Sequence, residues 1–228
     1  MSTLEETSID RRLILATALV IPAIAFAAQN HMDRSKHKPS GVSGLESDVV
    51  AGALPDSDRA HAVSGMGVYR RKNGTTCGLY VGVSPLTGRD DKESGNMVLL
   101  DNGDSLTDIF GDDLKKKVKG ACGDGWTAEG MSKQGDYYVR GITVCTDQGD
   151  TSDRTVQGMR VWYSKLKENG TLEKDTNAEV WTSPTCGKWY DRAACDPGWL
   201  AVGVKAHVSN HHFRGVGLKC AEFKPGTN

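Results

Sequence analysis

The sequence lacks the short motifs that mark common catalytic sites. It contains no G-x-S-x-G, H-E-x-x-H, P-loop or G-x-G-x-x-G segment, so nothing in it indicates an activated serine, a zinc-protease helix or a phosphate-binding loop. It also contains no C-x-x-C pair, which argues against a structural zinc site. We therefore predict no cofactor and no metal, and we expect a binding protein rather than an enzyme.

Aromatic residues and net charge are also scarce. Aromatics make up 7% of the chain and the formal net charge is −1, whereas glycine is abundant at 27 residues. Low aromatic and high glycine content favours many short strands joined by turns over a helical bundle. Without a broad basic excess, nucleic acid is not an expected partner.

The chain has no apolar run of the length, about 20 residues, that crosses a bilayer. The longest run, "LILATALVIPAIAFA" at residues 13–27, follows Arg11 and Arg12 and ends on a small-x-small cleavage pattern. We interpret residues 1–27 as an export signal peptide that is similar to twin-arginine signals, which implies a periplasmic or secreted protein from a bacterium. An uncleaved N-terminal anchor is the alternative. After cleavage no membrane span remains.

Residues 28–61 are polar and lack a sustained period, so we predict a flexible linker before a folded domain at residues 62–228. Within this domain one phrase recurs: an apolar residue, any residue, Gly, then apolar-x-apolar. Its copies are "VSGMGVY" (63–69), "VRGITVC" (139–145), "VQGMRVW" (156–162) and "FRGVGLK" (213–219). The period of two predicts strands, and a glycine at a fixed place in a strand indicates a bulge or a close backbone approach.

A second phrase, "WTAEGMSK" (126–133), recurs as "WLAVGVKA" (199–206), and each copy precedes a polar turn and a first phrase. We expect two hairpins, each closed by its end cysteines. An even number of cysteines in an exported chain favours disulfides. The sequence does not fix the pairing, but the repeat favours these pairs: Cys122–Cys145, Cys195–Cys220 and, as a long-range bridge, Cys77–Cys186.

One segment departs from the strand period. Residues 104–119 place Leu106, Ile109, Phe110, Leu114 and Val118 at helical spacing, which predicts one short helix. The remaining strand-rich segments, roughly 62–120, 121–185 and 186–226, predict one closed all-β body around a common axis.

The stretch "GKWYDRAACDPGWLAVGVKA" (187–206) resembles the G-x-W…C-P-x-G…G-apolar signature of the vitelline membrane outer layer protein family. "DRTVQGMRVW" (153–162) is similar to a strand lead-in of that family, and the same cysteine and glycine layout occurs in exported bacterial proteins of unknown role. The resemblance covers about residues 62–226. It implies an all-β, β-prism-like fold with three antiparallel sheets around a pseudo-threefold axis, an architecture that jacalin-type lectins share.

Aromatic residues in turn-rich stretches are the candidate ligand-binding residues. Trp126 and Trp199 occupy equivalent repeat positions and are expected to fill core sites. An exposed aromatic face beside Asp or Asn commonly holds a sugar ring. The candidates on this ground are Trp181, Trp189 and Tyr190, together with Asp136, Tyr137 and Tyr138.

Three other sites are alternatives. His207 and His211 flank a predicted hairpin turn where a metal would fit. The acidic loops at 101–108 and 147–153 have oxygen ligands suited to calcium, although such residues also dominate plain turns. Paired carboxylates for glycoside hydrolysis need a separation that a sequence does not reveal.

The sequence therefore favours an exported non-enzymatic module that binds carbohydrate or another cell-surface polymer. A structural or protein-interaction component of the bacterial envelope is the alternative, with a protein as its partner. An enzyme acting on glycans is a third possibility.

Overall fold

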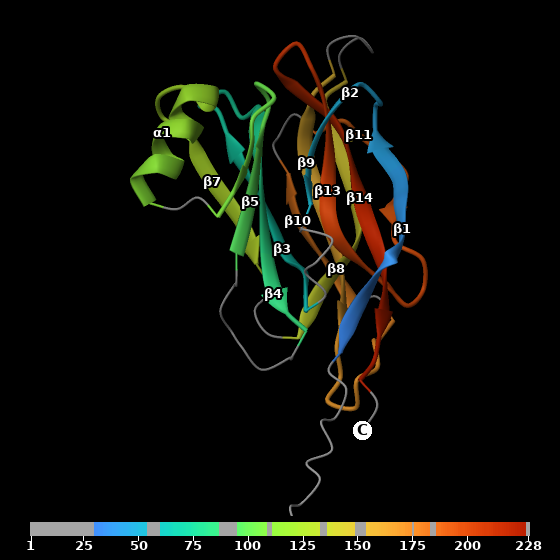
Figure 1. Cartoon of the computed structure of the whole chain (residues 1–228). Helices are drawn as coiled ribbons and strands as arrows, with labels where there is room; N and C mark the ends of the chain where they lie inside the picture. Colours follow the sequence, from blue (N-terminus) through green and yellow to red (C-terminus); the bar gives the residue numbers. More distant parts are fainter. Residues whose placement is uncertain are drawn as a thin grey trace, which may run out of the picture.

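The computed structural model places most of the chain in three antiparallel sheets (Figure 1). The structure describes residues 30–53, 60–86, 95–108, 111–132, 136–148, 154–174, 176–182 and 186–226. The predicted signal peptide at residues 1–27 lies outside them. In the described part of the chain no helix has the length and apolar character needed to cross a membrane.

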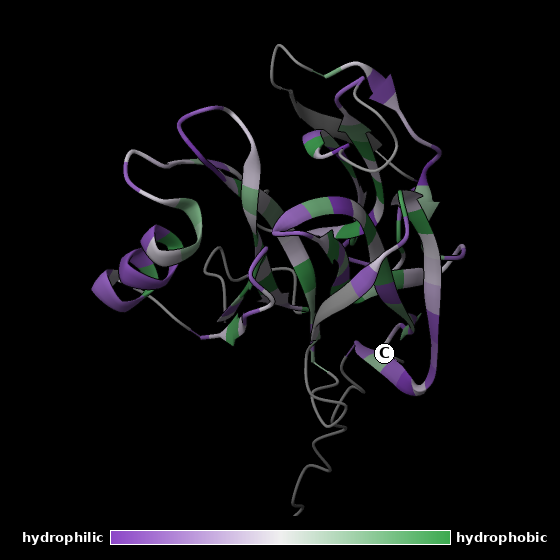
Figure 2. Ribbon diagram, turned by 90° about the horizontal axis from the view of Figure 1, so that it is seen from above, coloured by the Kyte–Doolittle hydropathy of each residue, from purple (hydrophilic) through white to green (hydrophobic). Residues whose placement is uncertain are grey.

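Sheet I has the strand order β6-β5-β4-β3-β7 and is built from one continuous part of the chain. Its strands are β3 (His61–Arg70), β4 (Thr76–Pro85), β5 (Gly95–Leu100), β6 (Ser105–Thr107) and β7 (Thr127–Ser132). The helix α1 (Gly111–Cys122) lies between β6 and β7 in the sequence and packs outside this sheet (Figures 1 and 2).

Sheet II has the order β10-β9-β8-β11, and β12 also pairs with β8. Its strands are β8 (Tyr137–Thr146), β9 (Val156–Lys165), β10 (Thr176–Thr182), β11 (Lys188–Trp189) and β12 (Ala193–Ala194). Sheet III has the order β1-β14-β13-β2 and joins both ends of the described chain. Its strands are β1 (His31–Gly44), β2 (Asp48–Ala53), β13 (Trp199–Ser209) and β14 (His212–Lys224).

All three sheets contribute to one apolar core. Val68 and Val81 come from sheet I, Ile142 and Val161 from sheet II, and Leu218 from sheet III, and all five are almost completely buried. Three sheets that each turn one face toward a shared interior form a β-prism, as predicted. Removing this apolar surface from water supplies the main driving force for the arrangement.

The prediction of a flexible linker at 28–61 is wrong for most of this segment. β1 pairs with β14 and β2 pairs with β13, so the N-terminal part of the chain completes sheet III. Met32 is fully buried, and Gly215 lets β1 approach closely, because a Cβ atom there would lie 2.9 Å from the carbonyl oxygen of Ser43. The folded domain therefore includes residues from His31 onward.

One of the two predicted hairpins is present. β13 and β14 pair as expected, but β7 pairs with β3 in sheet I and β8 pairs with β9 in sheet II. The chain thus leaves one sheet and enters the next between the two phrases that were expected to pair.

The same crossing explains the disulfides. All six cysteines are oxidised, and Cys195–Cys220 is bonded as predicted. The other two predicted pairs, Cys122–Cys145 and Cys77–Cys186, are wrong. The structure instead bonds Cys77 to Cys122 and Cys145 to Cys186, so that each sheet carries a bridge of its own.

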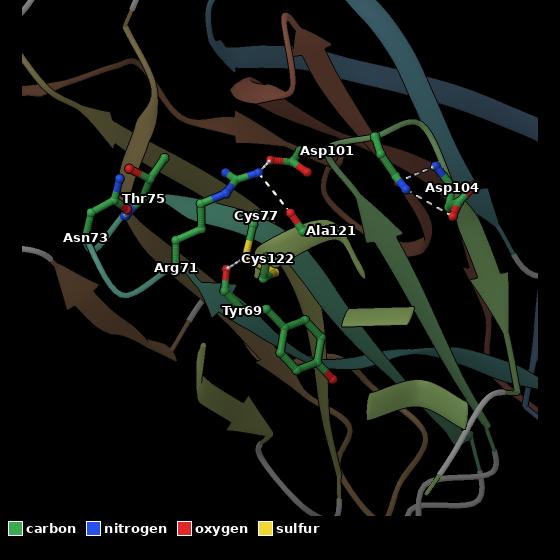
Figure 3. A network of polar contacts seen from close by, with 10 residues as sticks. Tyr69, Arg71, Asn73, Thr75, Cys77, Asp101, Asp104, Ala121 and Cys122 are labelled. Atoms are coloured by element: carbon green, nitrogen blue, oxygen red, sulfur yellow. Dashed lines mark hydrogen bonds and ion pairs between the residues drawn. A yellow bond between two sulfur atoms is a disulfide. The ribbon is translucent and has the colours of Figure 1, made fainter. Parts of the chain in front are cut away.

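The predicted helix exists but begins later in the chain. Residues 105–107 form β6, and the helix covers Gly111–Cys122, with Val118 buried under it. Its end is fixed to sheet I by the Cys77–Cys122 disulfide and by Arg71, whose Nη2 donates to the Ala121 carbonyl at 3.1 Å (Figure 3).

Candidate functional site

Five of the six predicted ligand-binding residues fall at the two ends of β8 in sheet II, and the sixth, Trp181, lies on β10. Trp189 lies on β11 opposite Cys145, near the end of β8, and Tyr190 follows it. Asp136, Tyr137 and Tyr138 lie at the start of β8. The strand separates the two groups, so they do not form one site.

The group at the start of β8 is largely structural. Tyr138 is 0% exposed and its hydroxyl donates to the Pro85 carbonyl, so its side chain has no surface to offer a ligand. Tyr137 is half-buried against the core, and the Asp136 carbonyl accepts a hydrogen bond from the Leu166 backbone at 2.7 Å.

Trp181 belongs to β10, where its backbone pairs with Met159 of β9. Its side chain lies outside the described residues.

Trp189 begins a row of alternating aromatic and cationic side chains on the outer face of sheet II. It is 37% exposed and is the one large hydrophobic side chain exposed among the described residues. The Arg160 guanidinium carbon lies 5.1 Å from the Trp189 ring centroid and 5.7 Å from that of Trp162. The Arg192 guanidinium carbon lies 4.6 Å from the centroid of the same Trp162 ring. We call these four residues the ladder.

Strand geometry explains why the ladder forms here. Successive side chains of a strand point to opposite faces of the sheet. On β9, Met159 and Val161 face the core, so the alternate residues Arg160 and Trp162 face outward. Arg160 pairs across the sheet with Thr143, and Trp162 pairs with Gly141. Cations above indole faces are attracted by the ring quadrupole, by about 0.5–1 kcal/mol each at exposed sites.

Gly141 makes room for the last member of the ladder. A Cβ atom at this position would lie 2.3 Å from Nε of Arg192. The guanidinium therefore lies against the backbone of β8, a close approach of the kind that the recurring glycine predicts. Any larger residue at 141 would displace Arg192 from its place beside Trp162.

Tyr190 adds a hydroxyl next to the ladder. Its ring packs partly on the core, Lys188 Nζ lies 4.9 Å from its centroid, and Arg154 Nη1 donates to its hydroxyl at 3.4 Å. Burial alone would raise the pKa of this phenol, but hydrogen bonds with Arg154 and Thr146 and the nearby positive charges lower the pKa below its ordinary value. The local field is therefore positive.

The outer faces of the other two sheets differ. α1 covers part of sheet I, where Trp126 meets Tyr69 edge to face at 5.5 Å. On sheet III, Trp199 is partly buried, and Lys38 lies 5.4 Å from its centroid but also pairs with Asp196 at 3.5 Å. Trp126 and Trp199 thus serve packing, as predicted, and sheet II alone exposes a tryptophan among the described residues.

The structure places no group of metal ligands at the predicted alternative metal sites, as far as their residues are described. His207 is buried, and its Nδ1 lies 3.1 Å from both the backbone nitrogen and the carbonyl oxygen of Ser47. Across the ranges that the structure describes, no group of three or more His, Cys, Asp or Glu side chains is placed to hold a metal ion.

A shallow cleft of about 350 Å³ lies at the end of the prism near the start of β8. Leu172, Pro197, Phe223 and Pro225 form its apolar wall, and Arg140 contributes a cation. None of the six predicted aromatic or acidic residues lines it.

Sequence reasoning missed Arg160, Trp162 and Arg192. The signal for two of them was present, because "VQGMRVW" places Trp162 two positions after Arg160 and therefore on the same face of the strand. A charged residue marks the solvent side, so Trp162 was identifiable as an outward tryptophan. Arg192 lies outside any regular period and gave no such signal.

No family model matches this chain, and no curated protein sequence matches it. Its structure is similar to that of the agglutinin of Calystegia sepium, with a TM-score of 0.45 and 12% identity over 83% of this chain and 97% of that one. It is also similar to frutalin from Artocarpus incisa (TM-score 0.43, 13% identity, 81% and 95% covered). A third similar structure is a prostate-specific WGA16 glycoprotein lectin (TM-score 0.42, 12% identity, 80% and 99% covered).

Proposed function

We propose that this protein is a non-enzymatic carbohydrate-binding module and that the outer face of sheet II is its binding surface. The observation that carries the proposal is the exposed Trp189 ring beside the hydrogen-bond donors of the Arg160 guanidinium. A sugar ring has apolar C–H faces and a rim of hydroxyls. A flat aromatic surface with donors around it matches both features.

We place the module outside the cytoplasm, in the periplasm or secreted by the twin-arginine route, with residues 1–27 as its signal peptide. Three disulfides support an oxidising compartment. Relatedness to the vitelline membrane outer layer family, on the residues 187–206 quoted above, is part of the same proposal.

The test is binding of the purified, oxidised protein to a panel of neutral and charged glycans and peptidoglycan fragments. Trp189→Ala removes the exposed ring, and we expect it to abolish binding while the melting temperature stays unchanged. Leu172→Ala serves as the control, because it alters the cleft at the other end of the prism.

The variants distinguish the surfaces. Loss of binding in Leu172→Ala but not in Trp189→Ala would move the site to the cleft and overturn the assignment to sheet II. A panel with no binding, from protein that unfolds cooperatively, would contradict the carbohydrate proposal. A protein that then copurifies from envelope extracts would favour the scaffold alternative.

A further inference from the structure

The ladder concentrates positive charge on one face of a protein that has almost none overall. The formal net charge is −1, yet two cations, Arg160 and Arg192, adjoin the outward rings of Trp189 and Trp162. Two more, Lys188 and Arg154, contact the neighbouring Tyr190. Asp191, between Tyr190 and Arg192 in the sequence, is the acidic residue of the same loop. The positive charge near these rings is therefore a local feature, which the net charge of the whole chain does not indicate.

Several cations elsewhere on the surface are paired with acids. Lys38 pairs with Asp196 and Lys36 with Glu222 on sheet III, and three of the four lysines of α1, namely Lys115, Lys116 and Lys119, pair with acids on and after the helix. Within the described ranges, neither Arg160 nor Lys188 forms an ion pair, and Nε of Arg160 is buried without a hydrogen-bond partner. These two cations have bonding capacity that the described part of the protein does not use.

Arg160 contacts both outward tryptophans of the ladder. Its guanidinium carbon lies 5.1 Å from the centroid of the Trp189 ring and 5.7 Å from that of the Trp162 ring. Hydrogen bonds from a guanidinium leave in its plane, along its N–H edges. A ring held by Trp189 would lie next to those edges, and an anionic oxygen on that ring is the acceptor that forms the strongest bonds with them.

We propose that the ladder selects acidic polysaccharides, in which sugar rings stack on Trp189 and their carboxylate groups accept hydrogen bonds from Arg160. This inference rests on the proposed function and names its ligand class. The occupant is a polymer, since Arg160 and Arg192 follow one another along the ladder and meet successive charges of a chain. Gly141 is a positioning residue here, because it allows Arg192 to lie against the strand.

The experiment compares polygalacturonate with its methyl ester by isothermal titration, because the two polymers share one sugar backbone and differ in charge. We expect binding of the acid form, at least about tenfold weaker binding of the ester, and an affinity that falls with added salt. Dextran sulfate and dextran form a second matched pair, which distinguishes a carboxylate site from one that also accepts sulfate. Polyglutamate and single-stranded DNA test for a site that accepts any polyanion.

Three variants assign the effect to residues. Arg160→Gln should weaken polygalacturonate binding about tenfold or more and leave the weak binding of the ester unchanged. Gly141→Ala should also weaken binding of the acid form, through Arg192. Lys38→Gln removes one positive charge beside a tryptophan on sheet III, so it is the matched control and should bind as the unmodified protein does. Thermal melting of each variant checks the fold.

The outcomes separate this inference from the proposed function. Equal affinity for the acid and the ester, with Trp189→Ala inactive and Arg160→Gln unaffected, would overturn the acidic ligand class and leave a carbohydrate site. Equal affinity for polyglutamate or DNA would overturn both statements and show a polyanion site. Absence of binding to polygalacturonate and dextran sulfate would refute the inference, while the neutral glycans of the panel decide the proposed function on their own.

Discussion

The buried carboxyl of Asp101 gives a pH dependence whose size follows from the structure. Asp101 comes directly after β5, is 2% exposed, and accepts a hydrogen bond at 2.6 Å from Nη2 of Arg71 (Figure 3). Its other oxygen, Oδ1, has no hydrogen-bond partner among the described residues. Burial raises the pKa of Asp101 to about 6, although the hydrogen bond and charge of Arg71 and the charge of His211 act to lower it.

The sign of the effect follows from linkage. The folded state binds the proton more tightly than the unfolded state, in which the pKa is near 3.8. The stabilisation is therefore fully present below about pH 4 and is lost as the pH rises through about 6. The displacement from 3.8 to about 6 corresponds to about 3 kcal/mol of unfolding free energy.

The perturbation is Asp101→Asn, which keeps the shape and the acceptor but does not titrate. The unfolding free energies of the unmodified protein and the variant should be measured in urea at several pH values from 4 to 8, with the disulfides intact. We expect their difference to shift by about 3 kcal/mol, against the unmodified protein, as the pH rises. The lowered pKa values of Asp33 and Glu222 act in the opposite direction, and subtraction removes them.

The charge of His211 acts on the Asp101 carboxyl, so the comparison should be repeated in a His211→Gln background. A difference that stays constant within about 0.5 kcal/mol, or one that changes in the opposite direction, would refute the argument that desolvation dominates at Asp101.

Two further predictions concern stability. Replacing Cys77 and Cys122 together by alanine opens a loop with a sequence separation of 45, and the chain-entropy model gives a loss of about 4 kcal/mol; a change below about 1 kcal/mol in urea unfolding would contradict it. Tyr138→Phe removes the hydrogen bond to the Pro85 carbonyl and should cost about 1 kcal/mol without changing glycan affinity; weaker binding at unchanged stability would return Tyr138 to the site.

The parts of the fold that the sequence predicted are those with a local signal. The recurring glycine phrase lies on β3, β8, β9 and β14, and the β13–β14 hairpin follows from one phrase, one turn and the next phrase. β1 gave no such signal. It is a polar edge strand with two register shifts in its pairing, and its partner β14 lies far away in the sequence.

The prediction of the disulfide pairing failed for a related reason. The repeat made Cys122 and Cys145 look like the two ends of one hairpin, but the chain changes sheets between β7 and β8. Which sheet a strand joins depends on contacts distant in the sequence, and no local pattern encodes them. The candidate site shows the same limit: Trp189 was identifiable from its turn-rich surroundings, whereas its contact with Arg160 required the register of β8 with β9 and β11.

The most direct test of the central claim is to observe the tryptophans during ligand binding. The chain has five tryptophans, and each indole N–H gives its own signal in a nitrogen–proton correlation spectrum, assignable by single Trp→Phe variants. During titration with the tightest-binding glycan, we predict that the signals of Trp189 and Trp162 shift and that those of Trp126 and Trp199 stay in place. Shifts at Trp199 or Trp126 without a shift at Trp189 would contradict the assignment of the binding surface to sheet II.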